Sequence, residues 1–511
     1  LTQAALLHQP PDGRHGLTSD RRLNAFFWTC IRKPQITPVV RRWNAAGRLG
    51  AYAWGFDDLS LNFNADSPDG NYGIKVTIPA LKSLQAGETT LSPTQIEELG
   101  DLRDKRLIHL QCNTGADTIS LARLGARVTG LGEHPAQALP AAVRHALTDY
   151  VQVPTLVDTD AVVARVLDHA SRSPIQRVEC LWEPFMTLAA QLREALDIGG
   201  MHTAQTELFR DKSKMKRALD AAGLRTPRHT TATGAEAIRA AAASIGLPLV
   251  IKPIAGAGSA NTHEVRDEEA LAAAIADVGE QREVSVEEFI EGEEFTFDTV
   301  CSEGRILYEN IAWYRPKPII GRATEWISMQ TVNLRDIDRP QFDAGRELGR
   351  RVLEALDFRT GFTHMEWFLT PDGEAVFGEI GGRPPGGRSV DLMNFTHDFD
   401  IYAGWAEAVT GQPFTQVASR RYNAAAIFKR ARGQGRISAV HGLDELRRRY
   451  GRHIVVEDLL PIGAPRRNWK QTLISDGYLI VRHPQLDKTL EIADAVGREV
   501  QDVLAVAGVV N

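Results

Sequence analysis

Residues 362–388 read FTHMEWFLTPDGEAVFGEIGGRPPGGR. Two apolar, aromatic-rich runs flank Thr370–Gly373, whose residues suit a tight turn, so the stretch predicts a β-hairpin. With a two-residue loop, Glu379 pairs with His364, which places Glu379 and Glu366 diagonally on one face. A three-residue loop would place the two glutamates on opposite faces, unless a bulge restored the parity. Their chemistry therefore depends on the register.

Carboxylates beside apolar strand residues are costly to bury, and divalent cations offset that cost. Glu366 and Glu379 are therefore candidate Mg²⁺ ligands. The second strand leads into a segment rich in glycine and proline that carries Arg383 and Arg388. Backbone and guanidinium groups there could approach an anion closely. The alternative is a surface hairpin with solvated charges.

The composition is that of an ordinary globular protein. The 511 residues suggest three or four domains, with 43% apolar and 24% charged residues. A net charge of −6 argues against a nucleic-acid partner. Four scattered cysteines read as thiols in a reducing compartment, and no apolar run is long enough to span a bilayer. We expect a cytoplasmic protein without membrane contact.

Residues 1–104 suggest no particular fold. Strand patterns follow at residues 106–112 and 125–131 with a helix between them, which predicts the start of a parallel sheet. This part resembles the beginning of one group of S-adenosylmethionine methyltransferases. Their second strand normally ends in an acid that binds ribose, whereas residues 131–135 read LGEHP, similar to the N-terminal domain of ATP-grasp ligases. We expect no S-adenosylmethionine binding.

A strand pattern at residues 178–182 ends at Glu183, at the sheet edge where ligands gather in open α/β folds. Glu183 could hold an amine substrate. The favoured interpretation is that it begins the helix that follows, since an acid is favourable in the first helical turn.

Two lysines precede the hairpin in patterns that suit phosphate binding. Lys212 lies in a predicted basic helix, and Lys252 ends a strand that runs into a glycine-rich loop with Gly256, Gly258 and Ser259. Such loops cradle phosphates with backbone N–H groups. It is not a Walker A loop, because its lysine precedes the glycines. A solvated basic helix is the alternative for Lys212.

Residues 283–298 alternate as a strand, turn at Glu291-Gly292 and alternate again. With the two lysines before it and the hairpin after it, this segment resembles the adenine hinge of ATP-grasp enzymes, especially carboxylate–amine ligases such as L-amino-acid ligases. The resemblance covers residues 131–511 and rests on motifs that occur in the family's order.

The resemblance implies a role for each matching residue. Lys212, Lys252 and the glycine-rich loop would contact the nucleotide phosphates. In the hinge, Glu287 would face the adenine amino group, Ile290 would pack on the base, and Glu294 would bind the ribose.

Glu366 and Glu379 match the acids that hold two Mg²⁺ ions, for which Mn²⁺ is an alternative, and Arg383 matches a phosphate-binding arginine. Two positions depart from the pattern: Gly381 stands where the family often has asparagine, and His364 where D-alanine–D-alanine ligases carry arginine. His364, Glu183 and Arg388 are retained as candidate substrate-binding residues.

The predicted fold class is α/β (α+β), an ATP-grasp fold with a Rossmann-like domain before it and a small α/β subdomain after it. The expected segments are an N-terminal extension (1–104), the Rossmann-like domain (105–205), the small lid domain (206–285), the large catalytic domain (286–420) and the C-terminal subdomain (421–511).

The implied activity is ATP-dependent joining of a small-molecule carboxylate to an amine, with amino-acid or peptide-like substrates. The carboxylate attacks the γ-phosphate to give an acyl phosphate and ADP, and the amine then displaces phosphate. Lys252 and Arg383 would be the catalytic cations. The alternatives are a methyltransferase or bifunctional protein, and a nucleotide-binding protein without turnover. A homodimer is compatible with this sequence, whereas nucleic-acid and membrane partners are not expected.

Overall fold

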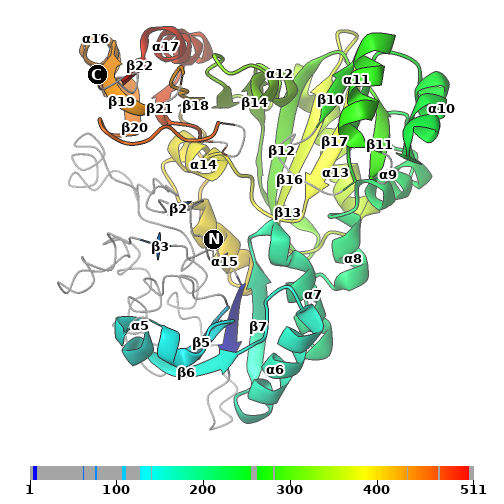
Figure 1. Cartoon of the computed structure of the whole chain (residues 1–511), viewed down its shortest axis with the longest axis vertical. Coiled ribbons are helices and arrows are strands. Elements are labelled where there is room, and N and C mark those ends of the chain that lie inside the picture. Colours follow the sequence, from blue (N-terminus) through cyan, green and yellow to red (C-terminus); the bar gives the residue numbers. More distant parts are fainter. Residues whose placement is uncertain are drawn as a thin grey trace, which may run out of the picture. The chain divides into compact units, whose positions relative to one another are not determined.

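The computed structural model describes short strands at residues 4–8, 61–62, 75–76 and 106–110, and then residues 127–139, 141–254, 262–279, 282–433, 435–469, 472 and 474–505. These residues form two compact units (Figure 1). The first unit includes residues 127–203 and 402–415, and the second includes residues 204–401 and 416–505. Within the described part of the chain, no helix has the length and apolar character needed to cross a membrane.

The first unit is built on a five-stranded sheet in the order β6-β5-β4-β1-β7. The pair β4–β5 is parallel, as the strand patterns predicted, and the pair β5–β6 is parallel too. β1 lies between β4 and β7 and is antiparallel to both, so the sheet includes residues assigned to the N-terminal extension. The strands are β1 (Ala4–His8), β4 (Arg106–Leu110), β5 (Arg127–Gly132), β6 (Leu147–Gln152) and β7 (Ile175–Cys180). A separate pair is formed by β2 (Leu61–Asn62) and β3 (Lys75–Val76).

Helices α6 and α7 pack against each other and bury the core of this unit. Val162 and Val166 from α6 meet Val178 of β7 and Leu192 of α7, and all four side chains are fully buried. The helices of the unit are η2 (Ala136–Ala138), α5 (Ala141–Ala146), α6 (Thr159–Arg172), η3 (Glu183–Phe185), α7 (Met186–Ala195) and α15 (Ile401–Val409).

Glu133, the acid after β5, is held by the loop that follows β6. Its carboxylate accepts hydrogen bonds from the Leu156 amide at 2.6 Å and the Thr155 hydroxyl at 2.8 Å. These bonds, led by the one from the Leu156 amide, lower the pKa of Glu133. Glu133 therefore has a local structural role.

The second unit contains a four-stranded antiparallel sheet in the order β10-β9-β11-β8. α10 contacts β8 and β11 while α11 contacts β10, and apolar residues of both helices form the core under this sheet. The elements are β8 (His229–Thr233), α10 (Ala235–Ile245), β9 (Leu249–Pro253), β10 (His263–Val265), α11 (Glu268–Val278) and β11 (Glu283–Glu288).

Helices α8 (Thr203–Leu208) and α9 (Lys212–Ala221) precede this sheet. Asp211 caps α9, because its carboxylate accepts from the amides of Ser213 and Lys214 at 2.9 Å each. The cap fixes the start of the helix at Lys212. Lys212 and Lys216 are then one turn apart and lie on the same helix face.

A larger antiparallel sheet follows in the order β17-β16-β12-β14-β15-β18-β21-β20, with β13 also paired to β12. The strands are β12 (Glu293–Ser302), β13 (Arg305–Asn310), β14 (Ala312–Arg315), β15 (Gln330–Asn333), β16 (Gly361–Leu369), β17 (Ala375–Gly381), β18 (Asn423–Phe428), β20 (Ile454–Leu459) and β21 (Gly477–His483). β19 (Arg436–His441) pairs with β22 (Gln501–Ala505) apart from this sheet.

α13 (Asp343–Ala355) packs on β12, β16 and β17 through two glycines on one face. A Cβ atom at Gly345 would lie 2.2 Å from Trp367, and one at Gly349 would lie 2.3 Å from Phe297. The absence of these Cβ atoms lets the helix approach the two buried rings closely. The remaining helices are α12 (Pro318–Ala323), η4 (Pro340–Phe342), α14 (Ser389–His397), α16 (Leu443–Tyr450), η5 (Gly451–His453) and α17 (Leu486–Glu499).

The predicted domain boundaries differ from the sheets in two places. The boundary at 285/286 falls inside β11, which belongs wholly to the four-stranded sheet. The predicted boundary at 420/421 falls within the larger sheet and not at its edge. After this boundary, β18 pairs with β15, β21 pairs with β18, and β20 pairs with β21. Strand pairing, which joins residues far apart in sequence, sets both limits.

Two expected elements are also corrected. Residues 313–326, whose aromatic and basic sequence predicts a loop, contain the end of β14 and the helix α12. The final helix, which the sequence pattern predicts at residues 486–507, ends at Glu499 and gives way to β22. Pairing with β19 explains the second case, since it takes up backbone groups that a longer helix would have bonded internally.

The hairpin forms, but the two-residue loop is wrong. Thr370 pairs with Glu374 through a hydrogen bond of 3.0 Å, so the loop has three residues and ends at Gly373, whose φ is +88°. The register then shifts by one residue at Gly378, where a Cβ atom would lie 2.8 Å from the Glu366 carbonyl oxygen. This bulge restores the parity and places Glu366 directly opposite Glu379.

Candidate active site

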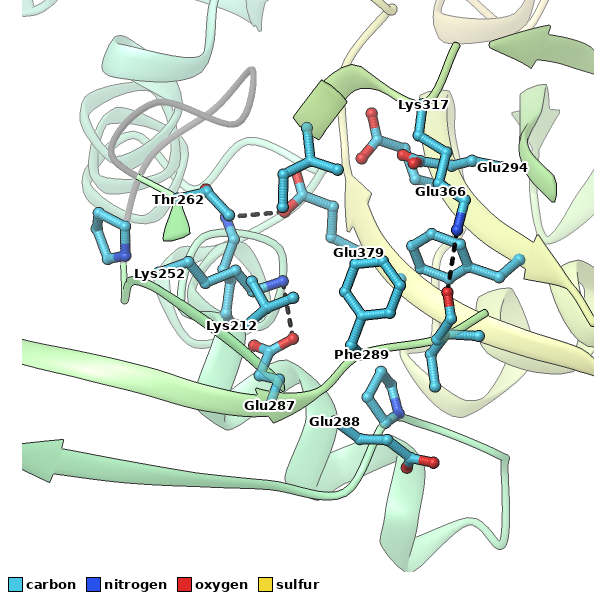
Figure 2. Close-up of a pocket in the computed structure, with 17 residues that line it drawn as sticks. Lys212, Lys252, Thr262, Glu287, Glu288, Phe289, Glu294, Lys317, Glu366 and Glu379 are labelled. Carbon is cyan, nitrogen blue, oxygen red and sulfur yellow. Dashed lines mark hydrogen bonds and ion pairs between the residues drawn. The ribbon is translucent and has the colours of Figure 1, made fainter. Parts of the chain in front are cut away.

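A pocket in the second unit lies between the four-stranded sheet and the hairpin end of the larger sheet (Figure 2). The residues that line it are Lys212, Pro227, Val250, Lys252, Pro253, Thr262, Glu287, Glu288, Phe289, Ile290, Glu294, Lys317, Ile319, Glu366, Phe368, Gly378 and Glu379. It combines an apolar part with lysines and glutamates, which are the groups that a nucleotide and its counter-ions require.

The two predicted metal acids face this pocket together. Glu366 on β16 and Glu379 on β17 are directly paired, so their side chains project from the same face of the sheet. Their side chains are 25% and 28% exposed, which leaves the carboxylates reachable. Glu366 accepts a hydrogen bond from the Tyr314 hydroxyl at 3.3 Å.

Lys212 lies across the pocket from the hairpin and forms an ion pair with Glu379 at 3.0 Å (Figure 2). Burial alone would raise the pKa of Glu379, but Lys212 and Lys252 outweigh it and lower the pKa to about 2. Glu379 is therefore ionised at neutral pH. Its ion-pair partner is the lysine that the sequence assigned to phosphate.

Glu287 is surrounded by donors from three directions. Lys252 contacts its carboxylate at 2.8 Å, Lys216 contacts the same oxygen, and the Ser285 hydroxyl donates at 2.7 Å. Burial opposes ionisation of Glu287, but the two ammonium groups outweigh it and lower its pKa. Burial also lowers the pKa of Lys216 to about 7 and would lower that of Lys252, but Glu287 raises the pKa of Lys252. The carboxylate expected to face adenine is thus bound to protein cations.

The segment that links the two sheets forms the apolar part of the pocket. Phe289 and Ile290 lie in it, and the Lys317 ammonium donates to the Ile290 carbonyl at 3.2 Å (Figure 2). The same ammonium lies 4.9 Å from the centre of the Phe289 ring, a cation–π contact. Glu294 is buried beside Glu366, and burial followed by this like charge raises its pKa well above the ordinary value.

His364 supports Glu366 and does not line the pocket. Its Nδ1 lies 2.6 Å from Asp298, and its Nε2 lies 3.5 Å from Glu366. Burial would lower the pKa of His364, but the two carboxylates, Asp298 first, raise it to about 9. The register explains the contact, since Asp298 pairs directly with His364 on neighbouring strands.

The two arginines of the Gly/Pro-rich segment have other contacts. Arg383 donates to the Pro384 carbonyl at 2.9 Å. Arg388 is buried and stacks on Tyr478 at 4.7 Å, and it bonds to Asp391 at 3.3 Å. Neither is among the residues that line the described pocket.

Glu183 and the glycine-rich loop, the remaining predicted site residues, are not among the residues that line the described pocket. Glu183 belongs to the first unit, where it begins η3. The predicted phosphate loop with Gly256, Gly258 and Ser259 lies outside the described residues. The proposed roles of all four residues stay predictions.

The carboxylates fit a metal ion that arrives with a phosphate ligand. Among the residues that the structure describes, no three His, Cys, Asp or Glu side chains form a group that could hold a metal ion. Mg²⁺ is commonly bound by one or two carboxylates plus substrate phosphates. The paired Glu366 and Glu379 supply that number of protein ligands.

Sequence reasoning missed three residues of this region, namely Lys216, Tyr314 and Lys317. Lys216 lies in the predicted basic helix, where it was interpreted only as part of a run of positive charges. Its spacing of four residues from Lys212 is the signal that places both lysines on one helix face. Tyr314 and Lys317 lie in the segment expected to be a loop. Their contacts with Glu366 and Ile290 depend on tertiary structure.

Comparison with known proteins agrees with this geometry. A family model described as an ATP-grasp domain matches residues 209–312. The formate-dependent phosphoribosylglycinamide formyltransferase of Anaeromyxobacter dehalogenans is 30% identical over 339 residues, which cover 64% of this chain and 81% of that protein. The chain therefore belongs to the ATP-grasp family, and the predicted fold is confirmed.

Two L-amino-acid ligases are also similar. The L-arginine-specific L-amino acid ligase of Bacillus subtilis is 26% identical over 242 residues, or 46% of this chain, and the chain spans only 58% of its length. The crystal structure of L-amino acid ligase from Bacillus licheniformis matches with a TM-score of 0.59 at 21% identity, over 76% of this chain and 94% of that chain. This structural likeness supports the fold.

Proposed function

We propose that the protein is an ATP-dependent carboxylate–amine ligase that forms a carbon–nitrogen bond through an acyl phosphate and releases ADP and phosphate. The observation that carries the proposal is the direct pairing of Glu366 with Glu379 opposite Lys212 and Lys252. Acids for a metal ion and lysines for phosphate oxygens then face one another across a single pocket.

Different residues of the pocket would bind the base, the phosphates and the metal ion. The apolar side chains of Val250, Phe289 and Phe368 would pack on the base. Lys212 and Lys252 would bind phosphate oxygens and offset the charge that moves during transfer. Glu366 and Glu379 would hold Mg²⁺, which when bound lowers the charge repulsion between the phosphates and an attacking carboxylate.

The names of similar proteins indicate the chemical class of the substrates, and we propose only that class. One similar protein is named for L-arginine and L-amino acids, and another for formate. All of these contain a carboxylate. We propose that the first substrate is an amino acid, which supplies the carboxylate, and that the second substrate is a primary amine. Two metal ions, a cytoplasmic location and a homodimer are part of the same proposal.

The test is amine-dependent ADP release, measured with a panel of amino acids and small acids that includes formate. Product identification by mass spectrometry separates amide formation from formyl transfer. We expect Glu379→Gln to abolish turnover while the protein stays folded, because the variant loses the charge of one metal ligand. Glu374→Gln is the matched control, since Glu374 lies on the same hairpin, is 48% exposed and pairs with Arg225. Full activity of Glu379→Gln would refute the metal assignment.

Arg383 separates a ligase from an ATP-binding protein without turnover. If it stabilises the departing phosphate, Arg383→Ala should lose on the order of a hundredfold or more in product formation. ADP affinity should be retained, and Arg383→Lys should recover only part of the rate, because lysine lacks the paired donors of guanidinium. Near-normal ligation by Arg383→Ala would show that this arginine only maintains the local structure.

A further inference from the structure

Lys216 is among the largest fully buried side chains of the described structure, with an exposure of 0%. It lies on α9 one turn after Lys212 and forms an ion pair with Glu287, whose side chain is only 4% exposed. The function proposed above does not use it. A lysine is almost never fully buried unless it is paired with an opposite charge.

The second partner of Glu287 explains what that charge could do. Glu287 also pairs with Lys252 at 2.8 Å, and Lys252 lines the pocket with a side chain that is 17% exposed. In the register of the sheet, Lys252 pairs with Ser285, which puts Glu287 diagonally beside it on the same face. One buried carboxylate is thus shared by a lysine behind it and a lysine in the pocket.

Without Lys216, the Glu287 carboxylate would be buried with Lys252 as its only cationic partner among these three groups. An uncompensated buried charge is costly, so the remaining pair would tighten. Lys252 would then be drawn toward Glu287 and away from any anion in the pocket. With protonated Lys216 in place, the three groups carry one net positive charge, which remains available to a phosphate.

We infer that Lys216 is a positioning residue that neutralises Glu287 and so leaves Lys252 free to bind the phosphates of the nucleotide. This inference rests on the proposed role of Lys252 in ATP binding and assigns a function to a residue outside the pocket lining. Lys216 itself does not touch the ligand.

The test compares ADP with adenosine, which lacks phosphates, by calorimetry in the presence of Mg²⁺. For Lys216→Met we expect ADP affinity to fall at least tenfold while adenosine affinity changes less than threefold. Lys214→Met is the matched control and should bind both as the wild type does. Lys214 lies on the same helix, is 44% exposed and pairs with Glu207.

A double variant tests whether the effect passes through Glu287. Adding Glu287→Gln to Lys216→Met removes the unpaired charge, so ADP affinity should recover to within a few-fold of the Glu287→Gln single variant. Lys216→Arg keeps the charge, so it should lose less ADP affinity than Lys216→Met. It provides a second test of the inference if the methionine variant does not fold. Thermal unfolding monitors the fold of each protein.

Wild-type ADP affinity in Lys216→Met would overturn the inference, as would an equal loss for ADP and adenosine or the absence of recovery in the double variant. Failure of the ligase proposal looks different, because it leaves wild-type ADP binding intact without any product.

Discussion

At the scale of single residues, the lysines and acids of the pocket pair with one another. Lys212 is paired with Glu379 and Lys252 with Glu287, so each lysine proposed for phosphate is already held by an acid. Such pairs reduce the cost of burying the charges. A nucleotide with its metal ion would replace these contacts with a second set, metal to glutamate and lysine to phosphate.

His397 offers a residue-scale prediction about pH. It is buried, its Nδ1 accepts from the Arg420 amide at 2.9 Å, and burial followed by Arg420 lowers its pKa to about 3. The folded-state pKa lies below the unfolded value, so the stability contribution is present above about pH 6.5 and is lost as the pH falls toward 3.

We expect the difference in unfolding free energy between wild type and His397→Gln to decrease by about 1.4 kcal/mol per pH unit below pH 6.5. Urea denaturation of both proteins at several pH values measures it, and the acid titration of all other groups cancels in the difference. A difference that stays constant from pH 7 to pH 4 would mean that His397 takes up a proton as readily in the folded protein as in the unfolded one.

At the scale of elements, the close packing of α13 on the larger sheet holds the strand that carries Glu366. Gly349 faces Phe297 with no room for a methyl group. Gly349→Ala should destabilise the protein by about 1–3 kcal/mol through overpacking, although alanine favours a helix by roughly 1 kcal/mol over glycine.

Chemical denaturation of Gly349→Ala beside Glu347→Ala provides the measurement. Glu347 is exposed on the same helix, so its variant should change stability by less than about 0.5 kcal/mol. A stabilised Gly349→Ala would show that the ring of Phe297 moves aside at little cost.

At the scale of the whole molecule, the pocket is lined by residues of both the four-stranded and the larger sheet of the second unit. A ligand that binds only the folded protein stabilises it, by about 2.7 kcal/mol at a concentration one hundred times its Kd. MgADP should therefore raise the thermal midpoint of this unit.

Chelation of the metal with EDTA should remove most of that shift, because the carboxylates of Glu366 and Glu379 would then face the ADP phosphates with no metal ion between them. Differential scanning calorimetry with ADP, with MgADP and with Mg²⁺ alone gives the comparison. An equal shift for ADP with and without metal would contradict the role of the paired glutamates.

The sequence by itself determined the order of the chemical groups and most of the elements around them. The basic helix that carries Lys212, the strand that ends in Lys252 and the hairpin that carries Glu366 and Glu379 follow from local patterns of hydrophobicity, charge and turn residues. Such signals act between residues close in the chain, which is why they could be read without a structure. The ATP-grasp fold class was predicted from a family resemblance, which rests on the order of these motifs along the chain.

Only the tertiary structure decided which of these groups meet. The bulge at Gly378, which makes Glu366 and Glu379 direct partners, depends on how two strands pack together. The sharing of Glu287 by Lys216 and Lys252 joins a helix to two strands, and the extension of the larger sheet by β18, β21 and β20 joins segments far apart in sequence. Contacts of this kind are set by burial and strand pairing across the whole unit, and local sequence patterns carry no record of them.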